Sequence, residues 1–205
     1  HIINSKYNNV KFFLHFADMT DSSNLMRLIA EIRPNGTRTV RAYSIDLKDY
    51  VEFSIDDDKG PNASHFRYIF GVVREMMKLG VPVEGFDTAF AGDVPLGAGM
   101  SSSAALESCF AFALNDLFGD NKIDKMTLAK VGQATEHSYL GCKCGIMDQF
   151  ASVHGKAGYL MRLDCRSGEF EYFPWNPQGY KLVLVNSCVK PVSYTHLTLP
   201  TSDLV

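Results

Sequence analysis

The pattern of apolar and polar positions predicts a succession of strands and helices from about residue 28 onward. Residues 28–33 and 51–55 alternate in part between apolar and polar side chains, as expected for half-buried strands. The segment 34–37, Pro-Asn-Gly-Thr, is a tight-turn signal, and residues 39–44 can pair back on 28–33 as a hairpin. Further strands are expected over residues 86–90, 158–163, 170–173 and 180–185.

Three helices are expected from apolar spacing and from their end signals. The first has Ser64 as a candidate N-cap and Gly80 as its stop. The second covers 103–118, is apolar over most of its surface and is therefore expected to be buried. The third begins at a cap on Asp124 or Thr127 and runs to about Leu140. The first helix carries a stripe expected to pack into the core: Phe66, Ile69, Phe70, Val73, Met76 and Met77.

Strands and helices are mixed without a regular βαβ repeat. The pattern therefore predicts an α+β fold, with a mixed or antiparallel sheet packed with helices. A chain of 205 residues is long enough to bury a sizeable core.

Composition narrows the class of protein. Hydrophobic residues make up 46% and charged residues 21%, with a formal net charge of −3, which gives no broad basic face for nucleic acid. No apolar run approaches the roughly 20 residues of a membrane span. The five cysteines form no Cys-x-x-Cys pair, so reduced thiols in a cytoplasmic protein are expected. The oligomeric state is not indicated.

The most informative stretch is 92–107, Gly-Asp-Val-Pro-Leu-Gly-Ala-Gly-Met-Ser-Ser-Ser-Ala-Ala-Leu-Glu. Gly97 and Gly99 let the backbone approach a ligand closely, and residues 101–103 supply hydroxyl and N–H groups where a helix begins. Such a helix start attracts anions such as phosphate. A loop with a simple helix cap is the alternative interpretation. The stretch is neither a Walker A loop nor a dinucleotide-binding turn.

A second segment, 136–150, contains two carboxylates twelve positions apart. Glu136 is expected at a helix end, and Asp148 follows a bend that begins at Gly145. Phosphoryl transfer uses one carboxylate to help hold Mg²⁺ and another to accept or orient the proton of the attacking hydroxyl. Taken singly, the aspartate could be a loop cap and the glutamate a solvated helix residue.

In this order, the two segments resemble the GHMP small-molecule kinases, and among them the galactokinases. The resemblance covers about residues 25–190 and continues through 162–167, Arg-Leu-Asp-Cys-Arg-Ser. It implies an incomplete GHMP-kinase-like N-terminal domain. It also implies a magnesium- and ATP-dependent enzyme that phosphorylates the C1 hydroxyl of galactose to galactose 1-phosphate.

The resemblance also implies roles for individual residues. Asp148 is then the catalytic base, and Gly145 lies beside the sugar. Glu136 and either Ser102 or Ser103 contact Mg²⁺. The ATP phosphates are wrapped by Gly97, Ala98, Gly99, Met100, Ser101, Ser102 and Ser103.

The chain departs from the family pattern at both ends. Residues 1–27 lack the motif Gly-Arg-x-Asn-Leu-Ile-Gly-Glu-His-x-Asp-Tyr, which supplies an arginine and much of the sugar pocket in galactokinases, and the family's C-terminal half is absent. We therefore divide the chain into an unmatched segment 1–24, a partial kinase domain 25–190 and an unmatched tail 191–205. The tail resembles translated sequencing-adapter DNA, so we expect an artefact there.

Three other functions remain open at this point. A non-catalytic regulator that binds sugar and ATP would explain the missing motifs, and a kinase for a related sugar such as N-acetylgalactosamine would share the same residues. A serine hydrolase built on Ser102, His137 and Asp148 is the third, but the Gly-x-Ser-x-Gly elbow is missing. A packing role at a helix end, or solvent exposure, is expected for His137.

Overall fold

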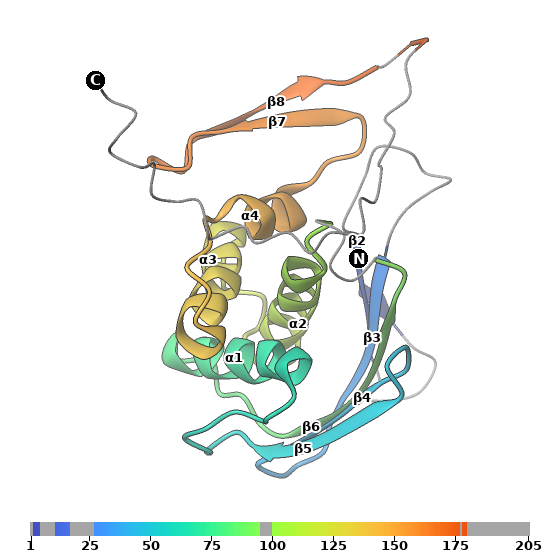
Figure 1. Ribbon diagram of the computed structural model, residues 1–205, viewed down its shortest axis with the longest axis vertical. Helices are drawn as coiled ribbons and strands as arrows, with labels where there is room; N and C mark the ends of the chain where they lie inside the picture. Colours follow the sequence, from blue (N-terminus) through green and yellow to red (C-terminus); the bar gives the residue numbers. More distant parts are fainter. Residues whose placement is uncertain (1, 5–10, 17–26, 95–99, 177, 180–205) are drawn as a thin grey trace, which may run out of the picture.

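A computed structural model describes residues 2–4, 11–16, 27–94, 100–176 and 178–179. Figure 1 shows a curved sheet with helices α1 to α4 gathered on one side of it. A separate two-stranded ribbon lies at the α4 end of the helical layer. This two-layer arrangement of a mixed sheet and helices confirms the predicted α+β class.

Within the described residues, the sheet has six strands in the order β1-β2-β3-β6-β4-β5. The β4–β6 pair is parallel and the other four pairs are antiparallel, so the sheet is mixed. The strands are β1 (Ile2–Asn4), β2 (Lys11–Phe16), β3 (Arg27–Pro34), β4 (Thr39–Ser44), β5 (Asp49–Ser54) and β6 (Phe86–Gly92). The sequence pattern had indicated no element for the first two.

The predicted hairpin of 28–33 with 39–44 is wrong, because β6 lies between β3 and β4. The Asn35-Gly36 turn holds the start of β6 instead. The Asn35 amide nitrogen Nδ2 donates to Asp87 Oδ1 at 2.9 Å, and the Gly85 N–H donates to the backbone carbonyl of Thr37 at 2.7 Å. A Cβ on Gly85 would overlap the Thr39 backbone, so this close approach requires glycine.

Alternation along the strands places one face of the sheet against the helices. In β3, Leu28, Ala30 and Ile32 are buried while the residues between them are exposed. Phe86 and Phe90 of β6 point to the same buried face. The period-two pattern is what a sheet with one covered face requires.

Among the described residues, four α-helices and one π-helical turn lie on that side of the sheet: α1 (Ser64–Lys78), α2 (Ser102–Phe118), α3 (Lys125–Thr135), η1 (Glu136–Leu140) and α4 (Met147–His154). The predicted stripe of α1 is confirmed, because five of its six members are buried and Met77 packs against the same core. Ala63, not Ser64, is the N-cap of α1, so the predicted cap is wrong by one residue. Gly80 follows the helix with a φ of 84°, a conformation that favours glycine.

The second and third helices follow their predictions closely. Helix α2 is buried over eleven of its residues and ends at Gly119. Asp124 caps α3, because its side chain accepts a hydrogen bond from the Thr127 N–H at 3.0 Å. The predicted continuation to Leu140 is the π-helical turn η1, which ends at Gly141 with a φ of 71°.

The ribbon consists of β7 (Tyr159–Leu163) and β8 (Phe170–Pro174), an antiparallel pair that confirms the two predicted strands. Its Phe170 ring lies 5.0 Å from the ring of Phe150 and 5.0 Å from that of His154 on α4. The Tyr172 hydroxyl donates to the His154 carbonyl at 2.6 Å. These contacts fasten the ribbon to α4. The predicted strand 180–185 and the tail 191–205 lie outside the described residues.

Candidate functional site

The serines of the glycine-serine stretch stand at the start of α2, as predicted. Ser101 is the N-cap and has a left-handed φ of 53°, and its carbonyl accepts the Ala105 N–H at 3.0 Å. Ser102 and Ser103 open the first turn, where backbone N–H groups lack helical partners. A helix start of this kind suits an anion. Gly97, Ala98 and Gly99 lie outside the described residues.

The two predicted carboxylates lie in different surroundings. Glu136 stands at the junction of α3 and η1 and is only 7% exposed, whereas Asp148 is exposed in the first turn of α4. A π-helical turn is rare and often marks a functional site. Helix α4 itself was missed by the sequence analysis, which placed only a bend before Asp148. The spacing of Phe150, Val153 and His154, all buried, was the available signal.

A third carboxyl group, that of Glu107, joins the two regions. Glu107 is fully buried, and its Oε2 accepts a hydrogen bond of 3.1 Å from the Gln149 amide, which is 1% exposed. Ser103 and Glu107 are four residues apart on α2 and therefore share one helix face. Gln149 follows Asp148 directly on α4. The hydrogen bond thus brings the serine-bearing start of α2 beside the start of α4.

Burial is the main reason why the pKa of Glu107 lies well above its ordinary value. The negative charges of Glu136 and Asp148 raise that pKa further, while the Gln149 hydrogen bond opposes the shift. The sequence analysis gave Glu107 no role. A carboxylate inside a mostly apolar helix, four residues after Ser103, was the signal that could have found it.

Two side chains contact the turn between η1 and α4 at one backbone carbonyl. The Cys144 carbonyl accepts a hydrogen bond from Gln133 Nε2 at 3.2 Å and lies 2.9 Å from His137 Nε2. His137 is exposed and contacts this turn, as the packing interpretation predicts. Burial, followed by the charge of Glu136, raises the pKa of the Cys144 thiol to about 12 and that of Tyr68 on α1 to about 12. Gly145 is exposed, and a Cβ there would meet nothing within 4 Å.

Residues 67–156 match the model of the GHMP kinases N terminal domain, a range that includes the start of α2, Glu136 and Asp148. The chain contains a GHMP kinase N-terminal domain.

Relatives of this GHMP kinase domain are galactokinases. The chain is 34% identical over 157 residues to galactokinase from Clostridium tetani, which covers 76% of this chain and 40% of the relative. It is 39% identical over 148 residues to galactokinase from Thermosipho africanus, and the match covers 72% of this chain and 41% of that relative. It is 40% identical over 152 residues to galactokinase from Clostridium acetobutylicum, covering 72% and 39%. The chain therefore spans about 40% of the length of these relatives.

Solved structures show the same fold. Lactococcus lactis galactokinase complexed with galactose gives a TM-score of 0.71 at 24% identity, covering 88% of this chain and 53% of that one. Mevalonate kinase from Methanococcus jannaschii gives a TM-score of 0.56 at 17% identity, covering 71% and 44%. At these identities the likeness concerns the fold alone.

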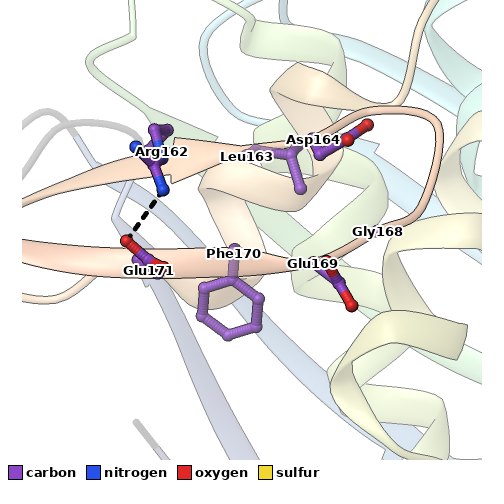
Figure 2. Close-up of a pocket in the computed structure, with 7 residues that line it drawn as sticks. All are labelled: Arg162, Leu163, Asp164, Gly168, Glu169, Phe170 and Glu171. Carbon is purple, nitrogen blue, oxygen red and sulfur yellow. Dashed lines mark hydrogen bonds and ion pairs between the residues drawn. The ribbon is translucent and has the colours of Figure 1, made fainter.

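The ribbon next to the GHMP kinase helices carries a hollow of its own. Figure 2 shows it between the ends of β7 and β8, with the Arg162 guanidinium paired to Glu171 at 3.0 Å. Its lining residues are Arg162, Leu163, Asp164, Gly168, Glu169, Phe170 and Glu171. None of the predicted site residues is among them.

In the part of the chain that the structure describes, no group of three or more His, Cys, Asp and Glu side chains has the arrangement of a metal site. Among the same residues, no helix combines the length and apolar character needed to cross a membrane.

Proposed function

We propose that this chain is part of a galactokinase, an enzyme that transfers the γ-phosphoryl group of ATP to the C1 hydroxyl of galactose. Its galactokinase relatives are 34% to 40% identical over most of this chain. The observation that carries the proposal is the 3.1 Å hydrogen bond between Glu107 and Gln149, because it joins α2, one turn after the predicted phosphate-binding serines, to the residue that follows Asp148 on α4. The kinase domain in this proposal covers residues 25–190.

In the proposed reaction, the Asp148 carboxylate accepts the proton of the C1 hydroxyl as the hydroxyl oxygen attacks the γ-phosphorus. The bond between the γ-phosphorus and the bridging oxygen breaks, and ADP leaves with that oxygen. Residues 97–103 bind the ATP phosphates through N–H and hydroxyl groups at the start of α2. Gly145 leaves room for the sugar, because no side chain lies within 4 Å of where its Cβ would be.

The proposed metal ligands are Glu136 and a hydroxyl of Ser102 or Ser103. Hard oxygen donors of this kind, few in number, fit Mg²⁺, which keeps several waters and also binds substrate phosphates. Bound there, Mg²⁺ would neutralise part of the charge on the phosphates during transfer.

The experiment compares the full chain with Asp148→Asn and with the exposed loop variant Asp58→Asn as a control. We expect galactose-dependent ADP release to fall on the order of 10²- to 10⁴-fold in Asp148→Asn, the usual contribution of a general base. Affinity for ATP, measured by calorimetry, stays unchanged in both variants, and Asp58→Asn keeps full turnover. An Asp148→Asn variant with near-normal turnover would remove Asp148 from the proposed role.

The same assay tests the other functions. A chain that binds ATP and galactose but releases no galactose-dependent ADP is the sugar- and ATP-binding regulator. A chain that turns over N-acetylgalactosamine faster than galactose is a kinase for that related sugar.

A further inference from the structure

Glu107 is a buried titratable group that the proposed reaction does not use. Neither its side chain nor that of Gln149 is more than 1% exposed, and each comes from a different helix. Buried polar groups are normally fully hydrogen-bonded, because an unpaired one is costly in free energy. Each polar atom of Glu107 and Gln149 is therefore expected to have a hydrogen-bond partner.

One hydrogen bond of this pair is formed, whereas one oxygen atom of each side chain has no partner. Gln149 Nε2 donates to Glu107 Oε2 at 3.1 Å and lies 3.9 Å from the Cys144 sulfur. Glu107 Oε1 and Gln149 Oε1 are both buried and have no hydrogen-bond partner. Both are acceptors when Glu107 is ionised. A proton on Glu107 supplies the missing donor, because a carboxylic acid and a primary amide can exchange two hydrogen bonds.

The electrostatic surroundings favour that proton. Burial is the largest cause of the raised pKa of Glu107, and the charges of Glu136 and Asp148 act in the same direction. A neutral Glu107 also avoids a third negative charge near two carboxylates.

The helices are packed closely around this pair. A Cβ on Gly132 of α3 would lie 2.8 Å from Gln149 Cγ and 2.9 Å from Glu107 Oε2. Glycine at 132 thus lets α3 approach both side chains where α2 and α4 meet. The pair is enclosed, and its geometry sets how α4 sits against α2.

We propose that Glu107 and Gln149 are a positioning pair, in which a protonated carboxyl and an amide exchange two hydrogen bonds and hold the start of α4 against α2. The consequence for catalysis, that the pair positions Asp148 relative to the phosphate-binding end of α2, rests on the function proposed above. The pair itself touches neither substrate in this proposal.

The test uses the full chain and three substitutions at the pair: Glu107→Gln, Glu107→Met and Gln149→Met, with the Met variants also combined. Gln at 107 keeps both hydrogen bonds without a charge, whereas Met fills a similar volume without either. Thr135→Val is the matched control, because Thr135 is fully buried on α3 and its hydroxyl has no hydrogen-bond partner.

The first readout is hydrogen exchange of the α4 backbone amides. We expect exchange to speed up on the order of tenfold in each Met variant, as for the loss of a buried hydrogen bond, with no further increase in the double variant. In Glu107→Gln and Thr135→Val, the exchange rates of these amides stay within about threefold of those in the unsubstituted chain. Equal acceleration in Glu107→Gln and Glu107→Met would overturn the pair, and so would unchanged exchange in both Met variants. If Glu107→Met does not fold, Gln149→Met and Glu107→Gln give the same comparison.

The second readout is steady-state turnover of galactose. The pair predicts that Gln149→Met lowers kcat about tenfold with KM for ATP unchanged, and that Glu107→Gln retains the kcat of the unsubstituted chain. The two proposals fail separately. Absence of turnover together with the expected exchange pattern rejects the proposed function and keeps the pair. Turnover that depends on Asp148 but an exchange pattern indifferent to the Met variants keeps the function and rejects the pair.

Discussion

Phe110 and Glu107 are three residues apart on α2 and equally buried, yet they face different neighbours. The Phe110 ring meets Phe90 of β6 edge-on at 5.9 Å and lies 6.3 Å from the ring of Phe86. Glu107 instead meets Gln149 of α4 near Gly132 of α3. One region of the molecule is an apolar interface between helix and sheet, and the other is a polar junction of three helices.

The two regions differ in how strongly their interactions depend on the orientation of the partners. Apolar burial stabilises in proportion to area and tolerates small rotations of the partners. Hydrogen bonds between buried polar groups require particular distances and angles, and leaving one unmade costs more free energy than making it yields. The junction, which borders the proposed catalytic residues, therefore fixes orientation, while the sheet-facing side supplies stability.

The largest expected effect is on the apolar side. Phe110→Ala should lower the free energy of unfolding by about 3–5 kcal/mol, because it removes a buried ring and leaves a cavity between α2 and β6. Urea unfolding followed by circular dichroism measures the loss. Phe112→Ala, at a partly buried position of the same helix, should lose less. Equal losses would contradict the assigned difference in burial.

Glycine substitutions sharpen the comparison at the junction. Gly132→Ala should destabilise the fold by about 1–3 kcal/mol through overpacking, an effect reduced by about 1 kcal/mol of improved helix propensity. Gly145→Ala, where a Cβ meets nothing, should stay within about 0.5 kcal/mol of the unsubstituted chain. Thermal unfolding of both variants and of the unsubstituted chain measures these two differences in stability. A neutral Gly132→Ala would contradict the tight packing of α3 against Glu107 and Gln149.

The pH dependence of stability probes the charge state of Glu107. Its pKa is raised in the folded chain, so above pH 4.5 the unfolded chain loses a proton that the folded chain keeps. The unsubstituted chain therefore loses stability relative to Glu107→Gln as pH rises above 4.5, with a limiting slope of about 1.4 kcal/mol per pH unit for one proton. Unfolding curves of both chains from pH 4 to 7 give the difference. A difference that does not change with pH would show an ordinary pKa for Glu107.

The smallest expected effect is at the start of α3. Asp124→Ala should lower the free energy of unfolding by about 1 kcal/mol, because Asp124 caps α3 by accepting a hydrogen bond from the Thr127 N–H. Hydrogen bonds from Thr127 lower the pKa of Asp124, so this stabilisation is present above pH 3.8 and is lost as pH falls through the lowered pKa. Asp124→Asn should keep the cap without the pH dependence. Chemical unfolding at pH 7 and pH 3 compares the three chains.

Local signals predicted most of the elements of this fold. The stripe of α1, the buried character of α2 and the Asp124 cap were all confirmed, because each depends on residues within about four positions of one another. Helix α4 was missed because it is short and its first turn follows a bend signal at Gly145. The predicted hairpin was wrong because strand order depends on Phe86–Gly92, a segment more than forty residues away.

The candidate site divides in the same way. The sequence by itself determined which groups carry the proposed chemistry, since the serines before an apolar helix and the Glu136 and Asp148 carboxylates are visible as motifs. Tertiary structure decided what brings them together: the close approach of α3 at Gly132 and the pairing of Glu107 with Gln149. The physical reason is that helix and turn signals are local, whereas burial and hydrogen-bond partners come from segments distant in the chain.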